Sequence, residues 1–327
     1  MKILSRRYSR RVGHPKACCL VVAGLAEAGP GSATPATAPA LFERVGSSAG
    51  GLCRLLALAG LVVGLRAAAP VSVDIFPGVA EVTFESDVLG APRKFCVVVP
   101  EVRPAGPADW PVLFLLHGRG RNHRSLVDVD DVRQMLRASP FCTVLPQGDD
   151  GWYIDSPVNR RERYESYLAE VMAVAARVQR LSGSPARRAI AGWSMGGYGA
   201  VRFATRHPAE FSVVAGIIGL LDFPRPEDLP KGQNYTVPLG RFGVNQAEWT
   251  LFNPMNSADA LRGKAVMIVT ATDSFDRTMN ERFHAGLNEL DIPHEYLVLP
   301  GEHTFDVVQA ALEPVLAFVA RNFATRR

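Results

Sequence analysis

The pentapeptide Gly-Trp-Ser-Met-Gly at residues 192–196 most constrains what this chain can fold into. It closes an apolar, strand-like run, and a helical pattern begins directly after it. Between a strand and a helix, Ser194 would lie on a sharp, strained turn, flanked by glycines because the neighbouring backbone leaves no room for a Cβ atom. Such a turn exposes the hydroxyl beside the N–H groups of a helix start, which stabilise developing negative charge. The pattern predicts a nucleophilic serine; the alternative is a glycine-rich turn with an idle serine.

Strand-like and helix-like segments alternate from residue 79 onward, which predicts an α/β fold with a mostly parallel central sheet and helices on both faces. The first two expected strands form an antiparallel pair. The expected strands are 79–84, 94–99, 111–116, 141–145, 189–193, 211–218, 265–271 and 295–299. The expected helices are 163–181, 197–207, 276–290 and 304–323.

One stretch, residues 219–263, breaks the alternation because it combines five prolines with aromatic and polar residues. A segment of this length inside a compact domain is usually functional. We expect it to form a lid-like or specificity insert beside the carboxyl edge of the sheet, with a passive surface excursion as the alternative.

Residues 1–70 have the composition of a targeting or low-complexity segment, which leaves 71–327 as the catalytic domain. Basic residues are followed by an apolar run at 17–26, a stretch rich in Pro, Ala, Thr and Ser, and a second apolar run at 55–65. A chain start near Val45 would explain two apolar runs in tandem.

The second apolar run has the length of a signal-peptide core and ends in three alanines, residues 67–69, which offer a cleavage site. Pro70 follows that site and would hinder cleavage. We expect export to the periplasm or the exterior, with membrane attachment only through an uncleaved segment. A membrane anchor or a disordered tail is the alternative reading of these runs.

The charge distribution gives no reason to expect a nucleic-acid partner. Nine of the 36 Lys and Arg residues lie in residues 1–70, against two of the 32 Asp and Glu residues, so the remainder is slightly acidic. Three of the five cysteines also lie there. Cys96 and Cys142 remain, which is no disulfide framework, although a single bridge between neighbouring strands stays open.

A serine hydroxyl needs a base within hydrogen-bond reach and a carboxylate that orients the base. In this architecture the order along the chain is Ser, then Asp or Glu, then His. Asp273 follows the apolar run 265–271, and His303 follows the strand-like run 295–299, so both lie where parallel strands deliver catalytic groups. We predict Ser194, His303 and Asp273 as nucleophile, base and acid.

Rivals exist for the acid and the base. Asp276 and Asp222 compete with Asp273, but Asp276 would lie in the first helical turn, where a capping role is available. Among the seven histidines, His303 alone combines the required order with a loop position.

The oxyanion hole is assigned to two backbone N–H groups. Met195 follows the nucleophile, and Arg119 lies in the turn after the strand 111–116, with Gly120 as the alternative if the turn is shifted. Trp152 and Tyr153 are expected to wall an acyl pocket, with aromatic core packing as the alternative. No metal or organic cofactor is needed.

Over residues 79–323 the chain resembles the esterase D or S-formylglutathione hydrolase-like branch of the α/β-hydrolases, which includes tributyrin and feruloyl esterases and bacterial mycolyltransferases. The matching motifs are Leu-Leu-His-Gly-Arg at 115–119, Gly-Trp-Tyr-Ile-Asp-Ser-Pro at 151–157, Tyr164-Glu165, the stretch 191–200, Ile-Pro-His-Glu-Tyr at 292–296 and Pro-Gly-Glu-His at 300–303. The resemblance implies Ser194, Asp273 and His303 as the triad. The chain departs from many relatives with Thr-Ala-Thr-Asp at 270–273 and with Glu302 in place of a glycine.

The resemblance and the leader together favour an exported serine carboxylesterase that acts on short acyl esters or on acyl groups linked to sugars. The expected partner is therefore a small-molecule or carbohydrate ester substrate. One alternative is an acyltransferase, in which a sugar hydroxyl replaces water. The other is a surface binding protein that keeps the fold without the chemistry.

Overall fold

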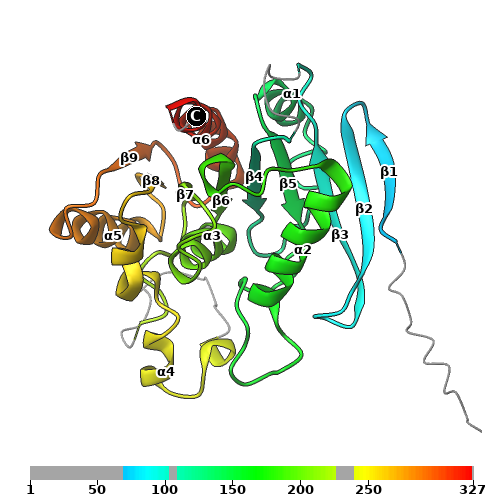
Figure 1. The fold of residues 1–327 in the computed structure, drawn as a ribbon. Coiled ribbons are helices and arrows are strands. Elements are labelled where there is room, and N and C mark those ends of the chain that lie inside the picture. The colour runs from blue at the N-terminus through cyan, green and yellow to red at the C-terminus, as the bar shows by residue number, and fades with distance from the viewer. Residues whose placement is uncertain (1–68, 103–108, 226–238, 326–327) are drawn as a thin grey trace, which may run out of the picture. The chain divides into compact units, whose positions relative to one another are not determined.

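A nine-stranded β-sheet is the centre of the computed structural model, which describes residues 69–102, 109–225 and 239–325 (Figure 1). The strands are β1 (Val71–Phe76), β2 (Val79–Ser86), β3 (Ala91–Val98), β4 (Val112–Leu116), β5 (Cys142–Pro146), β6 (Arg188–Trp193), β7 (Val213–Ile217), β8 (Ala265–Ala271) and β9 (His294–Leu299). Their order in the sheet is β1-β2-β3-β5-β4-β6-β7-β8-β9. Pairing is antiparallel from β1 through β3 to β5 and parallel from β5 to β9. The predicted fold class is confirmed.

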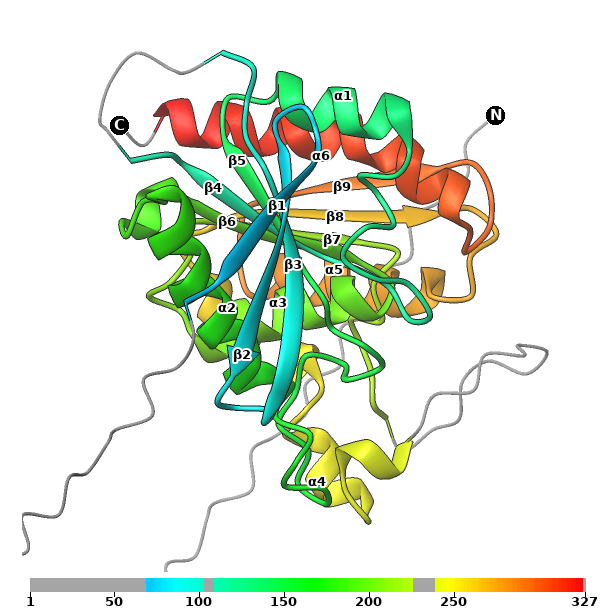
Figure 2. The same ribbon diagram turned by 90° about the vertical axis from the view of Figure 1, so that its right-hand side faces the viewer.

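Helices cover both faces of the sheet, as Figure 2 shows. They are α1 (Asp130–Ala138), α2 (Tyr164–Gln179), α3 (Met195–Arg206), α4 (Gln246–Thr250), α5 (Arg277–Glu289) and α6 (Phe305–Thr325), with short 3-10 helices η1 (Pro185–Arg187), η2 (Leu239–Phe242) and η3 (Pro254–Leu261). Helices α1 and α6 lie on one face, and α2, α3 and α5 lie on the other. The sheet is therefore the middle layer of three.

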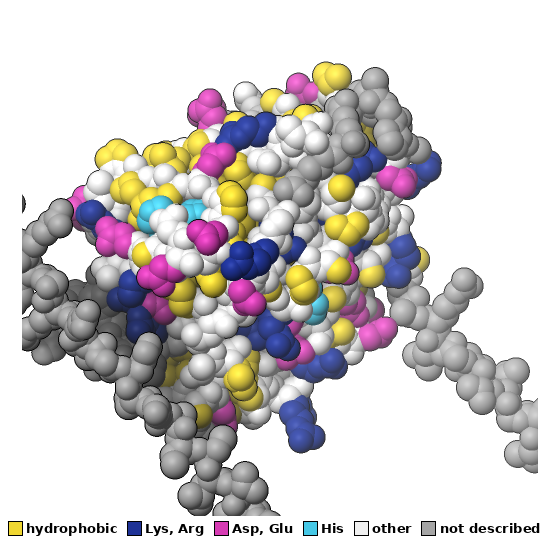
Figure 3. All heavy atoms as spheres, turned by 60° about the vertical axis from the view of Figure 1, so that its left-hand side comes forward, with side chains coloured by type: hydrophobic (Ala, Val, Ile, Leu, Met, Phe, Trp, Pro, Cys, Tyr) yellow, Lys and Arg dark blue, Asp and Glu magenta, His cyan; other side chains and the backbone are white. Residues whose placement is uncertain are grey.

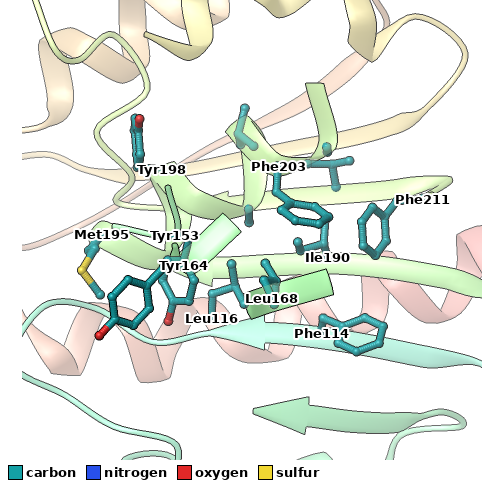
Figure 4. Packing of buried hydrophobic residues seen from close by; sticks show 14 of the residues in the cluster. Phe114, Leu116, Tyr153, Tyr164, Leu168, Ile190, Met195, Tyr198, Phe203 and Phe211 are labelled. Atoms are coloured by element: carbon teal, nitrogen blue, oxygen red, sulfur yellow. The ribbon is translucent and has the colours of Figure 1, made fainter. Parts of the chain in front are cut away.

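Each face of the sheet has its own hydrophobic core. The residues of β4 alternate between the two, because Phe114 packs with the α2 and α3 side, whereas Leu113 and Leu115 pack with α1 and α6. Figure 4 shows Phe114, Ile190, Phe203 and Phe211 in the first of these cores. A strand buried on both faces must be apolar throughout, which explains the uninterrupted apolar run of this strand.

Strand β1 and helix α1 have no counterpart in the sequence prediction, and neither do α4, which lies within the predicted insert, and the short 3-10 helices. Strand β1 is an exposed edge strand in which the apolar residues 71, 73 and 75 alternate with polar ones, and α1 is a short helix whose buried residues are Val132 and Leu136. Both segments carry the period of their structure, since Val132, Met135 and Leu136 have helical spacing, but with six and nine residues they repeat that period only once or twice. Cys96 and Cys142 lie in the cores on opposite faces of the sheet, so the disulfide bridge left open by the sequence does not form.

The leader assigned to residues 1–70 lies almost entirely outside the described residues, and so does 226–238 in the middle of the predicted insert. The described parts of that insert pack against the rest of the domain. Phe242 is fully buried, and the Tyr198 hydroxyl of α3 donates a hydrogen bond to the Phe252 carbonyl at 2.8 Å. These parts are thus anchored in the core beside α3.

Helix α6 is long and apolar enough to match a membrane span by length and composition. Its residues Leu312, Val315 and Val319 are completely buried in the core on the α1 side of the sheet. Core packing explains the apolar composition of this helix.

On the side of the molecule that carries α5 and β9, acidic and basic side chains are interspersed without a large area of one sign (Figure 3). Exposed pairs such as Arg277 with Glu281, on adjacent turns of α5, contribute to this pattern. Pairs of this kind add little to stability because water screens them.

An ion pair between the buried Arg202 and the largely buried Glu165 joins α2 to α3. The Glu165 carboxylate accepts hydrogen bonds from the Arg202 guanidinium at 2.6 Å and from the His207 imidazole at 3.0 Å. Burial alone raises the pKa of Glu165, but the His207 hydrogen bond and the Arg202 charge outweigh it and lower the pKa to about 2. The carboxylate therefore stays ionised, and its ion pair stabilises the packing of α2 against α3.

Replacing Glu165 by Gln should lower the free energy of unfolding by about 3 kcal/mol, because Arg202 would keep its charge in the core without a partner. Urea denaturation followed by circular dichroism measures the loss. The matched control is Glu281→Gln, which breaks the exposed pair with Arg277 and should change nothing measurable. Equal effects of the two substitutions would refute the structural role of Glu165.

Candidate active site

Ser194 occupies the predicted strained turn between β6 and α3. Its backbone has φ 55° and ψ −120°, a conformation that a residue with a side chain rarely adopts. A Cβ atom on Gly196 would lie 2.2 Å from the Leu116 carbonyl oxygen, and one on Gly192 would lie 2.3 Å from the Gly196 carbonyl oxygen. The glycines therefore permit the close backbone packing that holds Ser194 at the carboxyl end of its strand.

The imidazole of His303 lies between Ser194 and a buried carboxylate. Its Nε2 atom is 2.8 Å from Ser194 Oγ, and its Nδ1 atom is 2.7 Å from Oδ1 of Asp276. A carboxylate can only accept a hydrogen bond, so Nδ1, which faces Asp276, carries the proton. Nε2 is then unprotonated and accepts a hydrogen bond from the Ser194 hydroxyl. The structure thus brings together the predicted nucleophile and the predicted base.

The structure corrects the predicted acid, because Asp276 and not Asp273 contacts the histidine. Asp273 is exposed, its carboxylate accepts a hydrogen bond from the Thr272 hydroxyl, and its N–H donates to the Gly301 carbonyl. Strand β8 ends at Ala271, and the turn that follows directs Asp273 outward before Asp276 comes inward at the start of α5.

Asp276 is the N-cap residue of α5, but its side chain makes no capping hydrogen bond. It is completely buried and in phase with the buried face of this helix, which contains Met279, Asn280 and Phe283. A carboxylate in the apolar stripe of an amphipathic helix is the sequence signal that would have separated Asp276 from the exposed Asp273.

The turn that contains Arg119 packs against Ser194. A Cβ atom on Gly118 would lie 3.2 Å from Cβ of Ser194. His117 Nδ1 is 2.8 Å from the Gly118 carbonyl oxygen, and its Nε2 accepts from the Gly148 N–H at 2.8 Å. Nδ1 is therefore the protonated nitrogen, and it holds the Gly118 carbonyl. The N–H of the same trans peptide, which belongs to Arg119, points the opposite way.

Met195 is the first residue of α3, so its N–H has no acceptor within the helix. This amide and that of Arg119 are the two groups that sequence analysis assigned to an oxyanion hole. Both belong to backbone segments that adjoin Ser194.

Trp152 and Tyr153 do not wall a substrate pocket in this structure, which corrects their assignment. Both side chains are completely buried. Trp152 packs edge-on against Tyr198 and Phe242, and the Tyr153 hydroxyl donates to the His117 carbonyl at 3.3 Å. They belong to the core beneath the site, as in the alternative interpretation of aromatic core packing.

The side chains around the site are arranged by aromatic and ionic contacts. Phe275 lies over the His303 ring with a centroid distance of 4.3 Å. Arg121 lies over the Phe305 ring at 4.5 Å, whereas Arg119 pairs with Asp150. Within residues 69–102, 109–225 and 239–325 no cluster of three or more His, Cys, Asp or Glu side chains is arranged to hold a metal ion.

A mostly parallel sheet with helices on both faces and a strained serine at the end of a central strand defines the α/β-hydrolase fold. The model of the Esterase family, described as "Putative esterase", matches residues 86–318. The match covers well over half of the chain, and the chain therefore belongs to this family, whose class is that of the carboxylic ester hydrolases.

A curated relative, Esterase Rv1288 of Mycobacterium tuberculosis (strain H37Rv), is 26% identical over 267 residues, which cover 72% of this chain and 58% of that protein. The chain thus spans less than two thirds of the length of this relative.

Two solved structures are similar in fold. A ferulic acid esterase has a TM-score of 0.62 at 24% identity, with 75% of this chain and 98% of that chain covered. An S-formylglutathione hydrolase from Agrobacterium tumefaciens has a TM-score of 0.64 at 18% identity, with 78% of this chain and 100% of that chain covered.

The burial of His117 predicts how stability depends on pH. Burial lowers the pKa of His117 to about 4 from its ordinary value of 6.5. Between pH 6.5 and 4 the unfolded chain binds a proton that the folded chain does not, so acidification should lower the free energy of unfolding by up to roughly 3 kcal/mol.

Urea denaturation at several pH values across this window measures the slope. In His117→Gln, whose amide does not titrate, the slope should be shallower even if the variant is less stable at neutral pH. An unchanged slope would show that other groups cause the acid sensitivity.

Proposed function

We propose that this protein is a serine carboxylesterase that hydrolyses short acyl esters or esters linked to sugars through an acyl-enzyme. The observation that carries the proposal is the continuous hydrogen-bonded chain from Ser194 through His303 to Asp276. Membership of the Esterase family supports the same reaction class. The names of the two similar structures, a ferulic acid esterase and an S-formylglutathione hydrolase, support a substrate that is an ester or thioester.

In the first step Ser194 Oγ attacks the ester carbonyl carbon while His303 Nε2 takes the hydroxyl proton. The buried Asp276 carboxylate stabilises the resulting imidazolium. His303 then gives the proton to the departing alcohol, which leaves an acyl group on Ser194. A water molecule, deprotonated by the same Nε2 atom, releases the acid and restores the serine.

The carbonyl oxygen becomes an oxyanion in both steps. In our proposal the N–H groups of Met195 and Arg119 stabilise this charge, and the dipole of α3 adds to their effect because the oxyanion forms at its N-terminus. Both donors are fixed before substrate binds. Met195 is held by the strained turn, and Arg119 by the bond from His117 to the Gly118 carbonyl.

We further propose that the protein acts after export, because residues 55–69 have the composition of a signal-peptide core and a cleavage site. Mass spectrometry of the amino terminus of the protein from a culture supernatant or periplasm would test this part.

The choice of acid gives a sharp test. Asp276→Asn should lower kcat for p-nitrophenyl acetate by about 10,000-fold, because an amide at this position favours the wrong tautomer of His303. Asp273→Asn is the matched control, three residues away and exposed, and should keep kcat within about threefold. If Asp273→Asn is the inactive variant, our assignment of Asp276 is wrong.

Ser194→Ala should lower kcat by about a millionfold, on the pattern of serine hydrolases whose triad acts as a unit. It should also abolish labelling by a fluorophosphonate probe. Labelling that persists in Ser194→Ala, or a wild-type protein that is neither labelled nor active, would favour a binding protein of the same fold.

Incubation of the wild-type protein with p-nitrophenyl acetate and a sugar distinguishes hydrolysis from transfer, since only a transferase yields acylated sugar.

A further inference from the structure

The carboxylate of Asp276 accepts hydrogen bonds from three side chains in addition to His303. The Ser274 hydroxyl donates to Oδ1, the same oxygen that faces His303. The other oxygen, Oδ2, accepts from the Thr270 hydroxyl at 3.1 Å and from the Asn280 side-chain amide at 2.7 Å. Because the residue is completely buried, these donors replace the water that an ionised carboxylate requires.

Asn280 is unusual among these donors because its amide nitrogen faces three oxygens. Nδ2 lies 2.7 Å from Asp276 Oδ2, 2.9 Å from the Asp276 carbonyl and 2.8 Å from the Gly219 carbonyl. The amide orientation is therefore determined, since the flipped side chain would put its own oxygen against three acceptors.

This orientation leaves Oδ1 of Asn280 buried without a hydrogen-bond partner among the described residues. An unpaired buried acceptor is unfavourable for stability. An apolar residue would avoid it, and the site is otherwise part of the buried face of α5, beside Met279 and Phe283. The N–H groups of the Asn280 amide, and not its size or polarity, are therefore the feature that this position requires.

Asn280 also connects the acid to the backbone that supports the nucleophile. Gly219 follows β7 and packs against the start of α3, where its own Cβ atom would lie 3.1 Å from the Gly197 carbonyl carbon. The same segment holds the turn, because the Ser194 N–H donates to the Ile217 carbonyl at 2.9 Å.

We propose that Asn280 is a positioning residue of the active site, which keeps the Asp276 carboxylate oriented toward His303 and ties it to the Gly219 backbone. The inference rests on the proposed esterase function. Asn280 acts through Asp276, and its loss should reduce kcat more than it changes KM, since it lies beneath the acid and contacts no substrate.

A carboxylate at position 280 gives a readout that a merely structural role would not produce. In Asn280→Asp the new carboxyl group would lie close to Asp276 Oδ2, and two carboxylates at this distance share one proton. The protonated form donates as the amide does, but the doubly ionised form cannot. Activity should therefore be retained at low pH and lost as the pH rises.

Other groups that titrate or carry charge near this position are the same in all variants. They are His303 from the loop before α6, Tyr296 on β9, Arg277, Glu281 and Arg282 on α5, and Asp222 after β7.

The experiment compares kcat and KM for p-nitrophenyl acetate from pH 6 to pH 9 in the full-length wild type and the variants Asn280→Ala and Asn280→Asp. We expect Asn280→Ala to lose about tenfold to a hundredfold in kcat with KM nearly unchanged, the usual effect of removing a hydrogen bond to a buried charge. For Asn280→Asp we expect the ratio of its kcat to that of the wild type to fall about tenfold or more across this range.

The matched control is Asn288→Asp, which makes the same change on the same helix at an exposed residue and should leave the profile unchanged. If Asn280→Ala does not fold, Thr270→Val removes the other donor to Oδ2 and should show a smaller loss of the same kind. A kcat for folded Asn280→Ala within threefold of the wild type, or an Asn280→Asp profile parallel to the wild type, overturns the inference. Absence of activity in the wild type would instead reject the proposed esterase function.

Discussion

The hydrogen bond between His303 and Asp276 is the interaction on which the rest of the site depends. It joins two loops that follow neighbouring strands, β8 and β9, and it fixes which nitrogen of the imidazole faces the serine. A buried carboxylate can serve this purpose only if the surrounding structure supplies donors for its remaining lone pairs. The domain meets this requirement with side chains of β8, of α5 and of the turn between them, so the geometry of the site is a property of the packed core.

The sheet determines where these groups meet. Strands β6, β8 and β9 are parallel, and their carboxyl ends lie along one edge, so Ser194, Asp276 and His303 converge although they are far apart in the sequence. The strained backbone of Ser194 needs the close packing around Gly192 and Gly196, which in turn depends on the position of β4.

The sequence was sufficient to predict the parts of the fold that have strong periodicity. The continuous apolar runs gave the parallel strands with errors of one or two residues, whereas β1 and α1 were missed although they show strand alternation and helical spacing, because segments of six and nine residues repeat a period only once or twice. The order of residues and the strand ends gave Ser194 and His303.

The choice between Asp273 and Asp276 required knowledge of how the chain turns between β8 and α5, which spacing along the sequence does not contain. The assignment of Trp152 and Tyr153 to a pocket wall was wrong for a related reason, since large aromatic residues in an irregular loop can face either the solvent or the core. Both errors concern the direction of a side chain in an irregular segment.

The antiparallel strands β1, β2 and β3 occupy one side of the sheet, and none of the residues assigned to the site comes from them. The turn between β2 and β3 contains Gly90, around which a Cβ atom would meet no neighbour within 4 Å. A change in the length of this turn would therefore leave Ser194, Asp276 and His303 where they are. The ends of β6, β8 and β9, by contrast, must keep their relative positions for Ser194, Asp276 and His303 to stay in hydrogen-bond contact.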